Sequence, residues 1–404
     1  MTAASRSTGA PHLTGLAATL SAGMVMSTFV GYAFGALGPF IIDDLDLSRT
    51  ALGSLTTVMY FVGSILSPVL GPLVDRFGGR RSLLALFAVG SAGTVVASAT
   101  PGYAGLVAGA ALAGVAVALG NIATNQLIAR HVDPTRQGVV MGVKQSGVQV
   151  GAFLAGAALP ALAEAWGWRW ALATSALIAA AGVAGTLLTV PHHPGRFEMP
   201  RDPADIGAGP LGPAVNRLTA YSTLMGLGVG AAAAYLPLYA VEELGTGRRA
   251  AGLAAALMGL VGVVARVLWG RRHDRTATPV TRTLLVLAAA SVVAAGLVWA
   301  AEAAGVALLW AGAAAFGATA VAWNALGMLA IVRDVDSARA GRASGRVLLG
   351  FFAGYLAGPV SFGAVVDATD TYALGWAGVT AAFLAATAVG WRWRSASPAA
   401  DLST

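Results

Sequence analysis

Three basic side chains lie inside otherwise apolar runs of this chain, and they are its clearest candidates for chemistry. They are Lys144, Arg266 and Arg346. A charge in apolar surroundings is costly and usually serves a function, unless a long side chain carries it to the surface. Lys144 lies about eight residues, or ~12 Å, into its run, and it is the only lysine among 25 basic residues. Arg266 and Arg346 lie only about 4–7 residues from a run's end. We expect Lys144 and Arg266 to bind anionic groups, and Arg346 to mark an ordinary helix end.

Uncharged polar residues accompany these cations. Asn121 and Asn125 are four positions apart, as are Gln145 and Gln149, so each pair shares one face of a helix. Together with Asn324, they are natural donors to an oxygen-rich ligand. Hydrogen bonding between helices is an equally good interpretation of each residue singly. Aromatic residues that could line a cavity are weaker candidates: Tyr32, Tyr60, Tyr235, Trp323 and Tyr355.

The composition identifies the solvent around these residues. Of 404 residues, 57% are hydrophobic and only 11% are charged, and the mean hydropathy is +0.73. Soluble domains carry about a quarter charged residues, so a lipid bilayer suits this chain better. Cysteine is absent, and the five histidines lie in polar connecting segments. We therefore predict no cofactor and no metal site. The net charge of +7 is scattered in short clusters, which argues against nucleic acid as a partner.

Apolar runs long enough to cross a bilayer occur six times, then six times more after a break. The break, 191–217, holds six prolines and both signs of charge, and it is typical of an exposed linker. We predict an all-α membrane protein with twelve transmembrane helices in two bundles of six. The first run has no cleavage site after it and is expected to be a retained helix. The predicted runs are 13–42, 51–73, 82–99, 103–129, 137–163, 169–190, 218–241, 250–270, 283–301, 304–332, 343–366 and 372–391.

The arginines predict the orientation. Eighteen basic residues lie in loops on the side of the termini and four lie in the opposite loops. We expect the chain to lie in the inner or plasma membrane of the cell. Cytoplasmic loops of membrane proteins carry an excess of basic residues, so both termini are expected in the cytoplasm. The predicted parts are a cytoplasmic N-terminus (1–12), an N-terminal bundle (13–190), a cytoplasmic linker (191–217), a C-terminal bundle (218–391) and a cytoplasmic tail (392–404).

The two halves repeat each other. Asp75-Arg76 recurs as Asp274-Arg275, 199 positions later, and Asn121 recurs as Asn324 at an offset of 203. The offset of 203 also relates three pairs of glycines, which we expect to pack closely against helices of the other half. Parallel repeats imply a pseudo-two-fold axis along the membrane normal, with a substrate site between the halves. The glycine pairs are Gly142 and Gly345, Gly147 and Gly350, and Gly151 and Gly354.

The loop after the second run carries a more specific pattern, Gly71-x-Leu-x-Asp75-Arg76-x-Gly78-Gly-Arg80-Arg. With six plus six helices, it resembles the major facilitator superfamily over essentially the whole chain. The resemblance implies the major facilitator fold, a transporter working by alternating access, and a loop that latches the two halves in one state. A plain positively charged loop is the alternative. The latch residues are Gly71, Asp75, Arg76, Gly78 and Arg80, with Asp274 and Arg275 as the second copy.

The cargo follows from the charges. Cations without acids inside the apolar runs favour a small anion, of the monocarboxylate or cyanate type, and Arg266 in Arg-x-x-x-Gly resembles the eighth helix of carboxylate carriers. Proton symport, anion exchange and uniport stay open, as does the direction of transport. The superfamily's members are commonly monomers. Besides the lipid bilayer, a small anionic solute is the expected partner.

Two other functions compete with anion transport. Drug efflux is the first, although the Gly-Pro-x-x-Gly-Gly pattern of drug–proton antiporters is broken before Pro160. A non-transporting membrane sensor is the second, although only about a dozen residues follow the last run. No catalytic motif for a protease, esterase or nucleotide hydrolase occurs, so the chain is not expected to be an enzyme.

Overall fold

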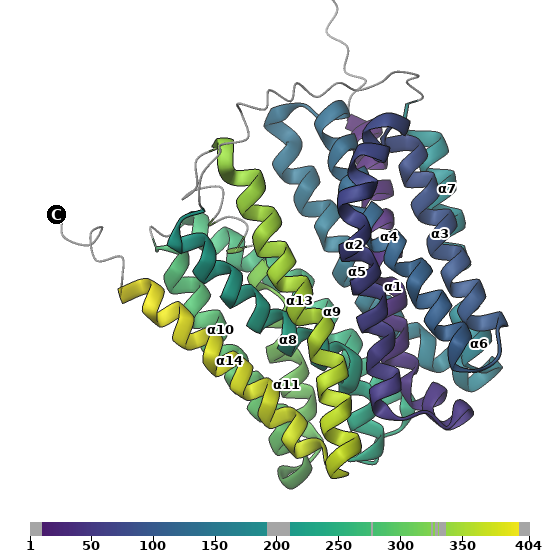
Figure 1. The fold of residues 1–404 in the computed structure, drawn as a ribbon, viewed down its shortest axis with the longest axis vertical. Helices are drawn as coiled ribbons and strands as arrows, with labels where there is room; N and C mark the ends of the chain where they lie inside the picture. The colour runs from purple at the N-terminus through teal and green to yellow at the C-terminus, as the bar shows by residue number, and fades with distance from the viewer. Residues whose placement is uncertain are drawn as a thin grey trace, which may run out of the picture.

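The protein is described by a computed structural model that covers residues 10–191, 211–275, 278–324, 326–327, 330 and 337–395. Every regular element in these ranges is an α-helix (Figure 1). The N-terminal half holds α1 (Ala10–Leu45), α2 (Arg49–Phe77), α3 (Gly79–Ala99), α4 (Gly102–His131), α5 (Pro134–Trp166), α6 (Trp168–Ala173) and α7 (Ala176–Thr189). The C-terminal half holds α8 (Pro213–Glu242), α9 (Arg248–Arg275), α10 (Val280–Ala304), α11 (Ala307–Ala318), α13 (Ser337–Thr369) and α14 (Tyr372–Ser395).

Eleven stretches of helix among the described residues are long and apolar enough to cross a membrane, α6 and α7 together forming one of them. The prediction of an all-helical membrane protein is confirmed, but the tenth run differs from the prediction. Within 304–332, α11 is 12 residues long and a turn follows at residues 319–322, after which the described residues Trp323, Asn324, Leu326, Gly327 and Ala330 are again helical. The helix α8 begins at Pro213, and the predicted linker stays a prediction. Residues 192–210 of that linker lie outside the described part.

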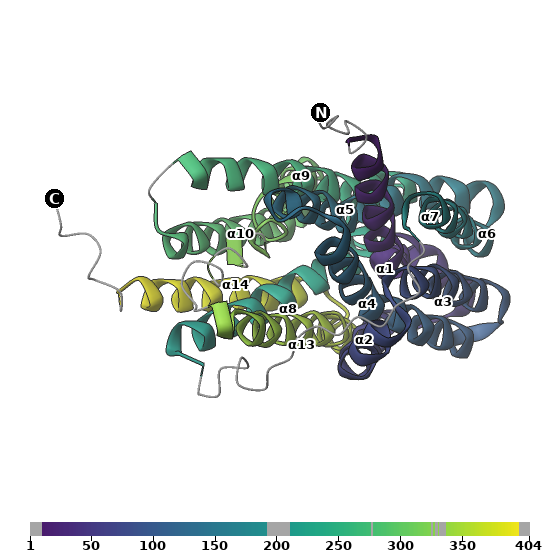
Figure 2. The ribbon, with the colours of Figure 1, turned by 90° about the horizontal axis from the view of Figure 1, so that it is seen from above.

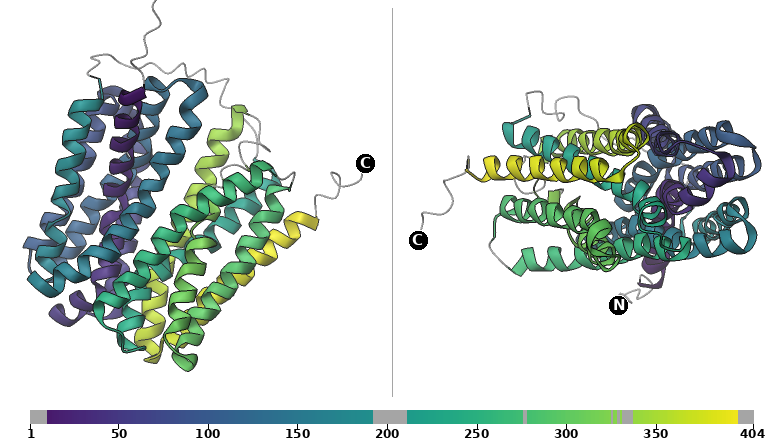
Figure 3. Two further views of the ribbon diagram at one scale, coloured as in Figure 1. Left: turned by 180° about the vertical axis from the view of Figure 1, so that it is seen from behind. Right: turned by 90° about the horizontal axis from the view of Figure 1, so that it is seen from below.

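The helices gather in two groups that follow the order of the chain. Seen from above, α1–α7 lie on one side and α8–α14 on the other, with α2 beside α13 and α5 beside α9 (Figure 2). We call the end of the molecule that carries the α1–α2 and α8–α9 connections the distal end. The opposite end, where α1 begins, is the terminal end. The two groups converge at the distal end and splay apart toward the terminal end (Figures 1 and 3).

Glycines allow the closest helix contacts within each half. Gly350, Gly354 and Gly358 are four positions apart on α13, and a Cβ on any of them would meet the backbone or side chains of α8. Such small residues let two helix backbones approach closely. In the N-terminal half, Gly147 and Gly151 face α1 in the same way. The expected close packing is therefore confirmed at these positions.

The partners of these glycines differ from the expectation. The contacts lie within one half, because the fifth helix of each half packs along the first helix of the same half. Gly142 and Gly345 differ further, since a Cβ there would meet nothing within 4 Å. These two glycines correspond to each other in the repeat, but neither forms a close contact with another helix.

A matched pair of substitutions on α13 tests the packing. Gly354→Ala places a methyl group against the main chain at Thr223, which cannot rotate away. We expect a loss of about 1–3 kcal/mol in unfolding free energy, typical of overpacking. Gly345→Ala enters open space on the same helix and should gain up to about 1 kcal/mol from helix propensity. Thermal unfolding in detergent, followed by circular dichroism, measures both. Equal unfolding temperatures for the two variants would contradict the assigned contact.

Candidate functional site

The Lys144 side chain is buried inside the N-terminal half. It projects from α5 with 1% of its surface exposed, and its Nζ donates to Asn121 Oδ1 at 3.3 Å and, more closely, to Asn125 Oδ1. The two asparagines come from one face of α4, as their spacing predicted. The structure thus brings together three of the predicted site residues.

The surroundings of Lys144 stabilise its charge only partly. An amide oxygen carries a partial charge, whereas a buried ammonium normally pairs with a carboxylate. In the part of the chain that the structure describes, no carboxylate contacts Lys144. The ammonium has three N–H donors, and the amides take two of them. Asn125 itself is exposed, so the pair of asparagines links the buried charge to the surface of α4.

Arg266 lies at the interface between the two halves. Its Nη1 donates to the backbone oxygen of Gln145 on α5, at 3.3 Å, across the interface. Its Nε and Nη2 donate to the backbone oxygen of Val321, at 3.4 and 3.2 Å. Both acceptors are neutral carbonyl groups. The guanidinium therefore keeps its full charge and has N–H donors to spare, because it carries five.

The break in the tenth run explains how Arg266 is held. The carbonyl oxygens at the end of α11 and in the turn after it need donors from outside that helix. Two side chains of α9 meet this need, because Trp269 Nε1 donates to Ala318 O at 2.9 Å while Arg266 reaches Val321 O. A cation near the C-terminal end of a helix is also favoured by the helix dipole. The local fold thus fixes the guanidinium without cancelling its charge.

Three further predicted residues gather around Arg266. The Tyr32 hydroxyl, from α1, lies beside the side chains of Gln149 and Tyr355 and within electrostatic range of Arg266. Gln149 is buried, and its Oε1 would lie 3.3 Å from a Cβ placed on Gly262. The buried Oε1 of Gln145 has no hydrogen-bond partner within the described residues. Residues of α1, α5, α9 and α13 therefore converge on this point from both halves.

Other candidates lie elsewhere. Trp323 is fully buried, with its ring 5.6 Å from that of Tyr221 and 5.7 Å from that of Phe351, so it packs in the interior of the C-terminal half. Asn324, its neighbour, is half-buried. Arg346 is exposed and lies near the start of the apolar span Ala343–Thr369 of α13.

The loop between α2 and α3 is a tight turn at the terminal end. Gly78 adopts φ +84°, a left-handed conformation that favours glycine, and its N–H closes α2 on Val74 O at 2.8 Å. Gln126 Nε2 donates to Asp75 Oδ1 at 3.0 Å, which ties the turn to α4.

The remaining latch candidates differ in what surrounds them. Arg80 Nη2 reaches Leu187 O on α7 at 3.3 Å, and the Arg76 guanidinium lies 5.8 Å from the centre of the Phe77 ring. Gly71 has open space around it, and Arg275 is exposed in the second copy. The side chain of Asp274 lies outside the described part of the chain. The predicted latching of the two halves stays a prediction.

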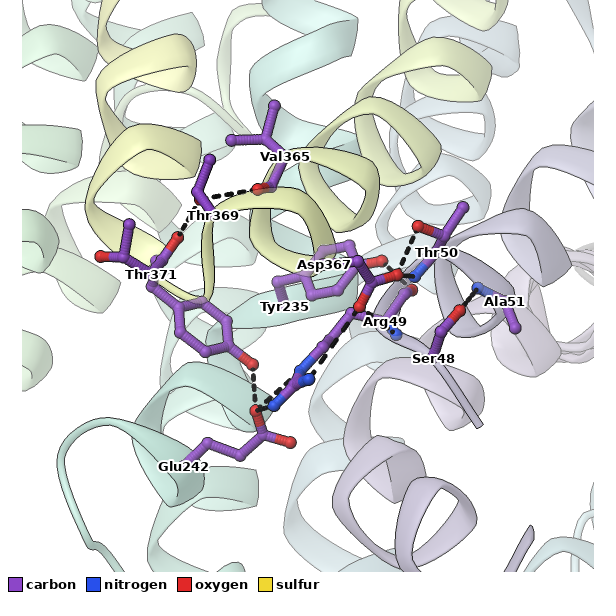
Figure 4. Close-up of polar contacts among 11 residues, drawn as sticks. Ser48, Arg49, Thr50, Ala51, Tyr235, Glu242, Val365, Asp367, Thr369 and Thr371 are labelled. Atoms are coloured by element: carbon purple, nitrogen blue, oxygen red, sulfur yellow. Dashed lines mark hydrogen bonds and ion pairs between the residues drawn. The ribbon is translucent and has the colours of Figure 1, made fainter. Parts of the chain in front are cut away.

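A polar cluster at the distal end was not predicted from the sequence. It joins Arg49 of α2 to Glu242 of α8 and to Asp367 of α13 (Figure 4). Arg49 is one of the four basic residues in the loops opposite the termini, and its place in the sequence indicates topology alone. The offset of 199 between Arg49 and Arg248, and between Asp43 and Glu242, is the signal that links these residues in the sequence.

The sequence pattern described as Major Facilitator Superfamily matches residues 19–345 and 222–403. The probable nitrate/nitrite transporter NarK2 of Mycobacterium tuberculosis is 29% identical over 276 residues, which are 64% of this chain and 67% of that protein. A facilitated glucose transporter, solute carrier family 2 member 10 of Homo sapiens, is 30% identical over 39% of this chain, and the match spans only 30% of that relative. The hexuronate transporter of Bacillus subtilis is 26% identical over 34% of this chain and 32% of that protein.

Solved structures share the fold. A bacterial homolog of the human lysosomal transporter Spinster, inward-facing and unoccupied, superposes with a TM-score of 0.72 at 15% identity, covering 95% of this chain and 97% of that chain. A mutant of the nucleoside transporter NupG gives a TM-score of 0.73 at 14% identity, over 93% of this chain and 99% of that chain.

Replacing the buried lysine tests whether its charge serves the fold. Lys144→Met keeps the length of the side chain and removes a buried charge that no carboxylate neutralises. We expect the unfolding free energy to rise by about 1–3 kcal/mol, because well-packed apolar groups often outperform buried ions. Arg346→Met, at an exposed site, should change it by less than about 0.5 kcal/mol. A lower unfolding temperature for Lys144→Met in thermal scans would assign the ammonium a structural role instead.

Proposed function

The chain belongs to the Major Facilitator Superfamily, and we propose that it carries a small anion across the membrane by alternating access of two six-helix halves. Lys144 and Arg266 are the residues that attract and bind the anion. Asn121, Asn125, Gln145, Gln149 and Tyr32 supply further polar contacts. The substrate is a small organic or inorganic anion of the monocarboxylate, cyanate or nitrate type.

One observation carries this proposal: among the described residues, two buried or interfacial cations are held by neutral oxygen atoms only. Lys144 is bound by two amide oxygens and Arg266 by two backbone carbonyl oxygens. If these cations served only to stabilise the fold, we would expect carboxylates beside them, since an unneutralised buried charge destabilises a protein. An incoming anion supplies the missing charge, and guanidinium pairs well with planar oxyanions such as carboxylate and nitrate.

The position of Arg266 connects binding with conformational change. Its guanidinium bonds α5 of one half from α9 of the other, so it lies where the halves move against each other. An anion bound there interacts with both halves in one state and with fewer groups in the other. That differential interaction is what allows a substrate to shift a two-state equilibrium.

The names of the relatives support an anionic cargo without selecting one. NarK2 is named for nitrate and nitrite, and a second relative for hexuronate, all of which are anions. A glucose transporter matches a shorter part of the chain. The charges at Lys144 and Arg266 favour the anionic group of relatives over the neutral sugar.

Uptake by proteoliposomes tests the function. We expect the purified protein to exchange a labelled small anion, with nitrate, formate, acetate and cyanate as competitors and glucose as the neutral comparison. Lys144→Met and Arg266→Gln should each lower the exchange rate at least about tenfold, because a hydrogen bond to a charged group contributes about 1.5–3 kcal/mol. Arg346→Gln removes an exposed arginine on the same half as Arg266 and should leave exchange within about twofold. Exchange of glucose but not of anions, or full activity of both site variants, would overturn the proposal.

The cytoplasmic placement of the terminal end is part of the proposal, supported by the excess of arginines there. The chain lacks cysteine, so single cysteines report accessibility cleanly. In intact cells, a membrane-impermeant thiol reagent should label Trp170→Cys at the distal end and spare Arg392→Cys at the terminal end until the cells are lysed. Both residues are exposed. The reverse labelling pattern would invert the topology.

A further inference from the structure

The distal cluster is a dense set of contacts between the two halves. Asp367, in the last turn of α13, accepts hydrogen bonds from the backbone N–H groups of Arg49 and Thr50, at 3.0 and 2.7 Å, and from the Thr50 hydroxyl at 2.5 Å (Figure 4). A carboxylate at the N-terminal end of a helix compensates the positive end of the helix dipole. The α13 carboxylate thus caps α2 of the other half.

The Arg49 side chain extends the cluster to α8. Its Nε and Nη2 donate to Glu242 Oε2, at 3.1 and 2.9 Å, and the Tyr372 hydroxyl donates to the same oxygen at 2.7 Å. The Tyr235 hydroxyl, also on α8, donates to the backbone oxygen of Arg49. Side chain and main chain of one residue are therefore both bound by the opposite half.

A second set of contacts joins the halves at the same end. Arg248, at the start of α9, pairs with Asp43 near the end of α1, and its guanidinium lies 4.7 Å from the centre of the Phe40 ring. Its neighbour Arg249 pairs with Glu164 near the end of α5. These residues again come from opposite halves.

The two sets are copies of one arrangement. Arg248 follows Arg49 by 199 positions, and Glu242 follows Asp43 by 199. The pairs Arg49–Glu242 and Arg248–Asp43 are therefore the same pairing with the halves exchanged. Asp367 follows Glu164 by 203, the offset that also relates Asn121 to Asn324. In both copies, a carboxylate of the half's fifth membrane-spanning helix contacts the start of the opposite half's second.

Glycine contacts one turn deeper obey the same relation. A Cβ on Gly53 of α2 would lie 2.5 Å from Pro359 O of α13, and one on Gly252 of α9 would lie 2.6 Å from Gly156 O of α5. Gly252 follows Gly53 by 199 and Pro359 follows Gly156 by 203. Both positions require glycine for close approach of the backbones. The duplicated contact thus includes both the ion pairs and the helix crossing beneath them.

We propose that these residues form a duplicated ionic gate that holds the distal end closed, with Arg49 and Arg248 as its two symmetry-related arginines. This inference rests on the alternating access proposed above, since opening the distal end must break both copies. The splaying of the helix groups toward the terminal end fits a molecule closed by this gate and open on the other side (Figure 3).

The two copies differ in strength. In the first, Arg49 and Glu242 expose 36% and 23% of their side chains, and backbone N–H groups and hydroxyls reinforce the ion pairs. In the second, Asp43 and Arg249 each expose 61%, while their partners Arg248 and Glu164 expose 37% and 34%. Arg249 stands where the first copy has Thr50, so a solvated ion pair replaces a capped helix end. Exposed ion pairs are weak, whereas partly buried ones with several hydrogen bonds are stronger. The Arg49 copy therefore dominates closure.

Spin-label distances across the distal end test the gate. Labels at Trp170→Cys and Val306→Cys are exposed and lie outside both ion-pair sets, one in each half. Double electron–electron resonance on the full chain, in liposomes without solute, should give mainly one short distance. Arg49→Ala should raise the fraction of molecules with a longer label-to-label distance at least threefold. Arg248→Ala should raise that fraction by a smaller factor. Arg169→Ala is the matched control, because Arg169 pairs with Asp44 of its own half at the same end.

Charge reversal separates pairing from folding. The double variant Asp43→Arg, Arg248→Asp should restore the short distance that Arg248→Ala loses, and Thr50→Val should weaken closure even if Arg49→Ala fails to fold. Distances equal to those of the parent in Arg49→Ala or Thr50→Val, or a shift as large in Arg169→Ala, would overturn the gate. A larger effect of Arg248→Ala than of Arg49→Ala would overturn its asymmetry. These distance measurements are made without solute, so they test the gate even if the uptake assay shows no anion transport.

Discussion

The cost of holding a positive charge away from water, without a negative charge beside it, is the constraint on which the rest of this structure depends. Lys144 and Arg266 both meet it with oxygen atoms that carry only partial charge. Such a solution lowers the desolvation cost and leaves each cation able to bind an anion. A carboxylate at either place would stabilise the fold more and would compete with the substrate. The neutral partners are thus consistent with a site in which affinity for solute has been favoured over stability.

The two cations are bound by different kinds of oxygen atom, side-chain amides for Lys144 and backbone carbonyls for Arg266. Lys144 lies within one half, bound by side chains of its neighbouring helix, so the proposed motion of the halves leaves its contacts intact. Arg266 is bound by main-chain oxygens on both sides of the interface, one of them freed by the end of α11. In the proposed alternating access, its contact with α5 changes as the halves move, whereas its contact with the turn at Val321 need not change. An anion near both residues would therefore meet a fixed ammonium and a guanidinium whose environment depends on the conformational state.

Much of this could be predicted from the sequence. Hydrophobic run length predicts membrane helices reliably, since backbone hydrogen bonds in lipid have to be satisfied within the segment. The four-residue spacing of Asn121 and Asn125 predicted one polar face, and that face does bind Lys144. The partners of Arg266 could not be predicted, because both are backbone carbonyls: one belongs to Gln145 within α5, and the other, at Val321, lies in a turn inside an uninterrupted apolar run. The distal cluster was missed for another reason. Its partners are about 190–320 positions apart, and only the repeat offset relates them.

The energetics of the distal end follow from its partial exposure. Partly exposed ion pairs contribute about 1 kcal/mol each, so the four described pairs that join the halves supply a few kcal/mol together. Reversing a 99:1 equilibrium takes about 5.5 kcal/mol of differential binding. A gate of a few kcal/mol thus lies within reach of one bound anion that pairs with a guanidinium and an ammonium. Four buried ion pairs at the same positions would close the distal end too firmly for a small solute to open. In the proposed transport cycle, their exposure to water, above all in the second copy, keeps the two states close in free energy, so that the gate can open and close repeatedly.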